Sequence, residues 1–394
     1  MVIQYESSKL ASRREHLLGI SLLAAFLLPH SNTFFLLINP LLCVLLVVFS
    51  SHKRKISYSF VAIVSIVVSL LLNMHVSNLK AFQSTFIILL YFVCFPFVGR
   101  VHVRNAYLYI CLSYIILSQM VYLLGISFLT NFFDTAYPIS DDDYNYYAHM
   151  QNSITFGNVF SYRLGGLYHN PNQCARAMTF LLAFFLALNT EKNYRRKVYF
   201  LIITYAGILL TGSRTGFVIS SLILYFGYLR DKEQSRNIRF LFVFLTLLGL
   251  SYVISTGAAL RGFDVESGLT NSVDSKFYTF LYYLSGESNV ASLLFGHFDS
   301  MLFTGKYGVA MHNFDSEYGE LVFRFGFVGT LGIMYFWWTT FKKVDKNVRF
   351  FFILFLWMIS STIVTSFRAF FMCMLLLSVL VANSHNNIGM TRDI

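Results

Sequence analysis

Charged residues are scarce in this chain of 394 residues. Only 12% of its residues are Asp, Glu, Lys or Arg, against roughly 25% in soluble domains, whereas 56% are hydrophobic. This composition excludes an ordinary soluble domain. Apolar runs of about 17 to 25 residues recur along the chain, and an α-helix of that length can cross a bilayer. The sequence therefore predicts an all-α, polytopic integral membrane protein.

Cysteine and proline are also rare, with five of each. The cysteines lie within apolar runs or at the start of one, and their spacing fits neither a disulfide framework nor a metal site. Among the prolines, only Pro40 and Pro96 interrupt predicted spans, and the spans are almost free of ionisable residues. Transporters and pumps usually place broken helices and buried charges near the bilayer midplane. These absences therefore favour work at a membrane surface over transport through the membrane.

Hydropathy indicates twelve candidate spans, and because the first is short and two pairs turn tightly, we predict ten to twelve. The spans lie near residues 16–29, 33–50, 57–74, 81–99, 106–128, 173–189, 198–213, 215–229, 240–256, 320–341, 350–367 and 369–383. No internal repeat or low-complexity linker separates them. We therefore predict a single integral domain over residues 1–394, with two large loops at 130–172 and 257–318.

The lysines and arginines divide unevenly between the two sides of the predicted membrane. With the N-terminus inside, 21 of the 30 lie on the cytoplasmic side, in short connections such as 53–55 and 192–197. Short loops rich in Lys and Arg stay in the cytoplasm, so we predict two cytoplasmic termini and two outward-facing large loops. The net charge of +11 is then a topology signal and requires no nucleic-acid partner.

Isolated arginines mark the predicted outer surface. Arg214 lies in a tight hairpin at residues 210–216, where two glycines and free backbone N–H groups beside a guanidinium suit a phosphate. Arg163, Arg176 and Arg261 are similarly isolated. Arginine is suited to phosphate because its planar fork holds two oxygens at once and keeps its charge. The alternative for each arginine is a side chain that extends to phospholipid head groups.

Residues 163–172 form a second polar motif, Arg-Leu-Gly-Gly-Leu-Tyr-His-Asn-Pro-Asn. Its paired glycines would let the backbone approach a ligand closely, and His169 and Asn170 add hydrogen-bonding groups. We expect the Asn-Pro-Asn sequence to form a turn, with Asn172 as the N-cap of the next helix. A purely structural turn is the alternative interpretation.

A third motif runs from His312 and Asn313 to Arg324. Asn313 is a candidate N-cap, and acids at Glu317 and Glu320 would then be favoured by the helix dipole. That structural interpretation leaves His312 unexplained. Glu320 lies four residues before Arg324 and Glu317 lies seven before it, so acid and cation would share one helix face. A carboxylate or imidazole at such a surface can deprotonate a hydroxyl.

In these three motifs the chain resembles the O-antigen polymerase and ligase superfamily of bacterial inner-membrane proteins. The resemblance covers roughly residues 160–340. It implies a GT-C-like, metal-independent glycosyltransferase that acts on undecaprenyl-diphosphate-linked oligosaccharides at the periplasmic surface, without a cofactor. The implied partners are that lipid-linked oligosaccharide, membrane lipid and a chain-length regulator protein.

The resemblance also implies roles for individual residues. Arg163 and Arg214 would hold the diphosphate leaving group, and His312 or Glu317 would be the catalytic base. Arg324 would hold a second phosphate or orient an acid. The further substrate-binding candidates are His169, Asn170, Asn172, Arg176, Arg261, Asn313 and Glu320.

Polymerisation of lipid-linked repeat units, yielding O-antigen or a related surface polysaccharide, is the first interpretation. Within the same superfamily, the alternative is a ligase that transfers finished polymer to lipid A core. Outside it, the alternatives are a flippase for lipid-linked oligosaccharide and a non-enzymatic assembly partner. The surface position of the arginines and the scarcity of proline within spans weigh against the flippase.

Overall fold

The computed structural model describes the chain in segments. They are residues 2–28, 38, 41, 43–45, 57–73, 79–94, 103–137, 164–168, 170–188, 193–226, 243, 246–248, 280–281, 283–285, 289–297, 303–304, 310–311, 317–344, 357–358 and 369–377. Most of these residues are helical, which confirms the all-α prediction for this part of the chain. A 3-10 turn, η3 (Gly166–Tyr168), and a pair of short antiparallel strands, β1 (Phe303–Thr304) and β2 (Ala310–Met311), accompany the helices.

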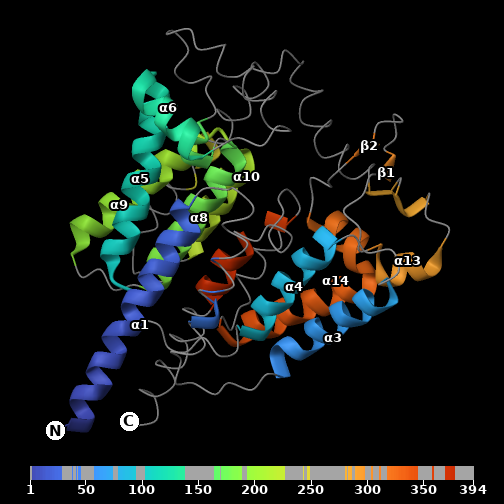
Figure 1. Cartoon of the computed structure of the whole chain (residues 1–394). Coiled ribbons are helices and arrows are strands. Elements are labelled where there is room, and N and C mark those ends of the chain that lie inside the picture. The colour runs from blue at the N-terminus through green and yellow to red at the C-terminus, as the bar shows by residue number, and fades with distance from the viewer. Residues whose placement is uncertain are drawn as a thin grey trace. The chain divides into compact units, whose positions relative to one another are not determined.

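Helices occupy many of the predicted spans (Figure 1). Their bounds are α1 (Val2–Leu27), α3 (Ser57–Leu72), α4 (Leu79–Cys94), α5 (Asn105–Leu124), α6 (Ser127–Ala136), α8 (Pro171–Leu188), α9 (Tyr194–Leu210), α10 (Arg214–Leu224), α13 (Val290–Phe295) and α14 (Glu317–Val344). Within the described segments, Asn105–Leu124 and Tyr318–Lys342 are long and apolar enough to cross a membrane, and shorter apolar helices accompany them. The spans predicted near 33–50, 240–256 and 350–367 lie mostly outside the described residues.

Helix forms at several places where the sequence predicted neither span nor helix, including α13 in the second large loop and two further stretches. Residues 130–136 were expected to open the first large loop, but they belong to α6. Residues 2–15 precede the first predicted span, yet they form the first half of α1. Neither stretch contains Gly or Pro, the residues that most strongly break helices. These helices were missed because a search for long apolar runs finds membrane spans and does not find polar or amphipathic helices.

The chain divides into two compact units. One comprises Met1–Asn39 and His102–Val265, and the other comprises Pro40–Val101 and Glu266–Ile394. Each unit therefore joins an early segment of the chain to a late one. The single integral domain over residues 1–394 stays a prediction.

Helix α8 is the centre of the first unit. Every residue from Cys174 to Phe185 is buried. Phe185 stacks on Phe200 of α9 with ring centroids 3.9 Å apart, and Phe184 meets Phe26 of α1 edge to face at 6.3 Å. Within a bilayer, helices associate through close packing of this kind because lipid is as apolar as the side chains themselves.

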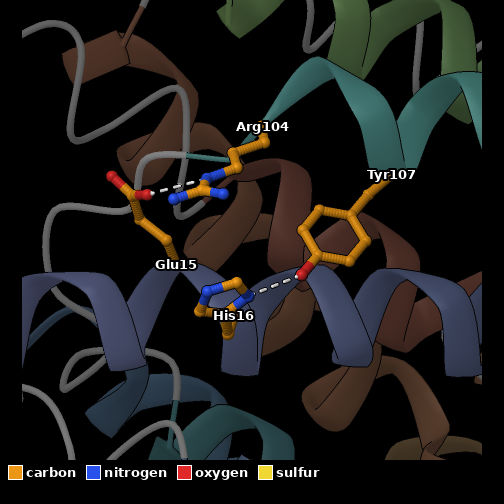
Figure 2. Close-up of polar contacts among 4 residues, drawn as sticks. All are labelled: Glu15, His16, Arg104 and Tyr107. Atoms are coloured by element: carbon orange, nitrogen blue, oxygen red, sulfur yellow. Dashed lines mark hydrogen bonds and ion pairs between the residues drawn. The ribbon is translucent and has the colours of Figure 1, made fainter.

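Helices α1 and α5 are joined by polar contacts near the start of α5 (Figure 2). The Arg104 guanidinium lies 3.5 Å from the Glu15 carboxylate, and the Tyr107 hydroxyl is hydrogen-bonded to His16 Nδ1 at 2.9 Å. Gly19 leaves room for the same tyrosine, since a Cβ there would lie 2.2 Å from its ring. These contacts fix one end of the α1–α5 pair.

Tyrosine hydroxyls cap the C-terminal end of α1. Tyr168 donates to the Phe26 carbonyl and Tyr137 donates to the Leu27 carbonyl, each at 2.7 Å. The last carbonyls of a helix have no partner within it, so these two bonds satisfy acceptors that would otherwise be orphaned. Residues later than α5 therefore meet the end of α1, while residues at the start of α5 meet its middle. The two helices therefore run in the same direction.

Helix α14 packs along α3 in the second unit through small residues. A Cβ at Gly332 would lie 2.0 Å from Ser65 Oγ, and a Cβ at Gly329 would lie 3.5 Å from Ser69 Oγ. Small residues at such positions let two helices approach closely. The neighbouring core is aromatic and includes Tyr91, Phe92, Phe336, Trp337 and Phe370.

Candidate functional site

The motif at residues 163–172 builds the start of α8. Asn170 is the N-cap, because its Oδ1 accepts from the backbone N–H of Asn172 at 2.9 Å and of Gln173 at 3.3 Å. Pro171 takes the first helical position, where a missing N–H costs nothing. The prediction that Asn172 would be the N-cap is wrong, since the helix begins two residues earlier. Asn172 is instead exposed in the first turn.

The second glycine of this motif serves packing. Gly166 has a φ of 53°, and a Cβ there would lie 2.5 Å from Ser118 Oγ of α5. The next residue, Leu167, donates its backbone N–H to that same hydroxyl at 2.9 Å. The expectation that a glycine here admits a ligand is therefore corrected at Gly166, where α5 is the close neighbour.

Arg214 is the first residue of α10. The preceding turn is short: Gly212 takes a φ of 58°, and Ser213 caps the helix by accepting from the Gly216 N–H at 3.3 Å. Arg214, predicted at the apex between two spans, therefore belongs to the first turn of the second helix. Arg214 is half-buried and directly follows this turn.

The structure brings these two motifs together. The Leu164 N–H donates to the Leu210 carbonyl at 3.0 Å, and Gln119 of α5 donates to the Leu164 carbonyl at 3.3 Å. A Cβ at Gly216 would lie 2.6 Å from the Cβ of Ala175. The first turn of α10 therefore touches the second turn of α8, with residues 164–168 packed beside them.

These two helix ends concentrate positive charge. Neither α8 nor α10 has an acid in its first turn, and Arg176 and Arg214 are the only charged residues of the two helices. Each helix N-terminus adds about half a positive charge. Arg176 is only 6% exposed, so protein and not lipid surrounds its side chain, and both arginines also interact within the protein. An anion is the ligand that this arrangement suits best.

The second unit contains a buried ion pair at the start of α14. Arg324 Nε donates to Glu320 Oε1 at 2.6 Å, with both side chains largely enclosed. The four-residue spacing predicted this contact, and it is confirmed. Because the pair is charge-assisted and shielded from water, Arg324 is placed to orient the Glu320 carboxylate.

Helix α14 is broken just after this pair. Gly326 has a φ of 66° within the helix, and a Cβ there would lie 2.2 Å from the Leu294 carbonyl oxygen. The Phe323 carbonyl next to the break accepts from the His297 N–H at 2.8 Å, and the Phe325 carbonyl accepts from Ser69 Oγ at 2.9 Å. Backbone groups freed by a break in a membrane helix need such partners.

His297 was not among the predicted site residues. Its ring packs against Tyr283 and Phe323, with centroids 6.0 and 5.2 Å away. The sequence signal that could have marked His297 is the glycine before it. Gly296 has a φ of 78° and its backbone closely approaches the Arg324 carbonyl, so the tight backbone crossing requires a glycine there. From the sequence, that glycine was only one residue of the predicted loop at 257–318.

Several predicted site residues lie outside the described part of the chain. They are Arg163, His169, Arg261, His312 and Asn313. Glu317 is the first residue of α14, and its side chain is likewise outside the description.

Comparison with known proteins yields no relative. No protein-family model, no curated protein and no solved structure matches this chain. Within the described segments, no group of three or more His, Cys, Asp or Glu side chains is arranged to hold a metal ion.

Proposed function

We propose that this chain is a polytopic glycosyltransferase that polymerises undecaprenyl-diphosphate-linked repeat units at the periplasmic face of the bacterial inner membrane. One observation carries the proposal: the N-terminal turns of α8 and α10 meet, each helix contributes an arginine, Arg176 or Arg214, and neither helix contains an acid. A diphosphate has the charge that this cluster would attract. The motif resemblance assigns the same region to the leaving group.

The chemistry follows from the donor. Nucleotide sugars are confined to the cytoplasm, so a glycosyl donor outside it must carry its own leaving group. An acceptor hydroxyl attacks the anomeric carbon of the donor, the bond between that carbon and the diphosphate oxygen breaks, and the hydroxyl proton passes to a base. Arg176 and Arg214 would stabilise the charge that develops on the departing diphosphate. The base proposed from the resemblance is His312 or Glu317, with the Glu320–Arg324 pair as an orienting group.

The ends of the helices support the proposed orientation. Arg195 and Arg196 lie in the first turn of α9, at the end opposite the Gly212 turn. Arg104 lies at the start of α5, at the end opposite the caps of α1. Clustered cations mark the cytoplasmic side, so the anion site would face the periplasm. We accordingly propose ten to twelve spans with both termini in the cytoplasm.

The surface glycan of a deletion strain tests this function. We expect core carrying a single repeat unit and no longer ladder, because units are made and ligated but never joined. Core without any repeat unit would instead indicate the ligase. A full-length ladder would contradict both activities.

A flippase is the second candidate, and the break in α14 at Gly326 favours it. Interrupted membrane helices commonly form transporter substrate sites. This break therefore weighs against the earlier argument that spans with little proline do not indicate a transporter. The two functions leave lipid-linked repeat units on different leaflets in the deletion strain. Accumulation on the cytoplasmic leaflet would support the flippase, and accumulation on the periplasmic leaflet would support the polymerase.

A further inference from the structure

Helix α6 begins where a membrane span ends. Helix α5, one of the described helices apolar and long enough to cross a membrane, has 20 residues, which is about 30 Å at 1.5 Å per residue. Its last turn closes at Gly125, which takes a left-handed φ of 63°, and the Ile126 N–H returns to the Val121 carbonyl. The chain therefore reverses within two residues, at the level of the bilayer surface.

One face of α6 is fastened to α5. The Phe133 ring is 3% exposed and lies 5.8 Å from the Tyr114 ring and 6.2 Å from the Tyr122 ring. The Tyr122 hydroxyl donates to Asp134 Oδ1 at 2.6 Å. Because Tyr114 lies ten residues before the end of α5, α6 folds back beside the final turns of the span and does not project away from it.

The opposite face of α6 is exposed and carries no charge. Phe128 is 79% exposed and Phe132, one turn later, is 53% exposed. The other exposed residues of the helix are Ser127, Asn131 and Thr135, all neutral. The one charged residue of α6, Asp134, is held by the tyrosine. Phenylalanine is among the apolar residues that interfacial helices bury at the boundary of head groups and acyl chains, and no charge on this face opposes such burial.

This exposed face continues the apolar surface of the span. Leu117 and Leu124 of α5 are 54% and 60% exposed, and Ile126 in the connection is also exposed. In a bilayer, the exposed Leu117 and Leu124 would face acyl chains, and the exposed first turn of α6 closely follows Leu124 along the chain.

We propose that α6 is an interfacial helix whose Phe128 and Phe132 side chains insert among the acyl chains of the leaflet at the C-terminal end of α5. The first part of the predicted outer loop is thus embedded in lipid. This inference does not depend on glycosyl transfer, because it rests on the length of α5, the fold-back and the uncharged exposed face.

Site-specific fluorescence tests the insertion. All five native cysteines are buried, so an introduced Phe128→Cys can be labelled selectively with an environment-sensitive NBD maleimide in the full-length protein. The protein is then reconstituted with phosphatidylcholine that carries a nitroxide either on the head group or at a shallow or deep acyl position. Leu117→Cys is the matched control within the span, and Asn131→Cys is the control on the same helix. Phe132→Cys reports the same face if the Phe128 variant does not fold.

We expect the label at position 128 to be quenched at least twofold more by the shallow acyl nitroxide than by aqueous iodide. The label at position 117 should respond most to the deep nitroxide, and the label at position 131 should respond more to iodide than the label at 128 does. Strong iodide quenching at position 128 without nitroxide quenching would overturn the proposal. Energy transfer between labels on two copies, with neither quencher effective, would also overturn it, because a second copy would then cover this face.

Discussion

Arg214 and Arg176 each lie within the first two turns of a helix, but they differ in burial. Arg214 is half-buried at a turn, whereas Arg176 is enclosed. A cation near a helix N-terminus is disfavoured by the dipole, and the two helices that carry these arginines touch where Gly216 meets Ala175. Their common position is explained if an anion binds there.

Replacing Arg214 with lysine tests that explanation. Arg214→Lys keeps the charge and loses the planar fork, so we expect chain extension to fall about 10- to 100-fold, the equivalent of one charge-assisted bond of about 1.5–3 kcal/mol. Arg196→Lys is the matched control, because Arg196 is an exposed cation at the opposite end of α9. The measurement is the glycan ladder at equal amounts of membrane-inserted protein. Wild-type ladders from a stable Arg214→Lys variant would remove Arg214 from the phosphate role.

The Glu320–Arg324 pair makes a different residue-scale prediction, because each side chain is less than a third exposed. Removing one partner leaves a charge buried alone, which typically costs about 3–5 kcal/mol. We expect Glu320→Gln to lower the thermal midpoint of the detergent-purified protein more than the double variant Glu320→Gln with Arg324→Met does. The single variant Arg324→Met completes the comparison. If the double variant lowers the thermal midpoint by the sum of the decreases in the two single variants, the two side chains are not coupled.

Among the elements, α14 departs most from an ordinary membrane span. Its break places two carbonyls, of Phe323 and Phe325, against donors from His297 and Ser69. Gly296 and Gly326 make the crossing possible, because at each a Cβ would overlap backbone from the other segment. The kink is thus built by long-range packing.

Two glycines with positive φ differ in both backbone conformation and overlap: Gly125 is left-handed helical with a ψ of 35°, whereas Gly326 has a ψ of −176°, a region almost restricted to glycine. Gly326 and Gly125 have φ of 66° and 63°, but a Cβ at Gly125 meets nothing within 4 Å. Gly125→Ala should cost about 1–2 kcal/mol for the left-handed conformation alone. Gly326→Ala should largely prevent folding, since the Leu294 carbonyl would be displaced. Size-exclusion chromatography of fluorescently tagged protein measures the yield of folded protein for both variants. Equal yields would show that the crossing of Gly296 and Gly326 does not hold the α14 kink.

The sequence predicted some elements well because their signals are local. Long apolar runs marked α5 and α14, and a four-residue spacing paired Glu320 with Arg324. The start of α8 was misplaced because Asn170 and Asn172 are both good caps, and only the position of Pro171 separates them. The packing of Gly166 on Ser118 and the contact of Gly216 with Ala175 join residues distant in sequence, which no local pattern reveals.

At the scale of the whole molecule, each of the two units carries part of the proposed chemistry. The first has the proposed anion site at the N-terminal ends of α8 and α10, and the second has the Glu320–Arg324 pair beside the α14 break.

Reconstitution tests the central claim most directly. The purified protein is placed in proteoliposomes with lipid-linked repeat units extracted from the deletion strain, and glycan length and released undecaprenyl diphosphate are measured together. The account predicts one undecaprenyl diphosphate released for each unit added, and a rate about 10- to 100-fold lower with Arg214→Lys. Intact donor lipid and unextended glycan in the presence of folded wild-type protein would contradict it.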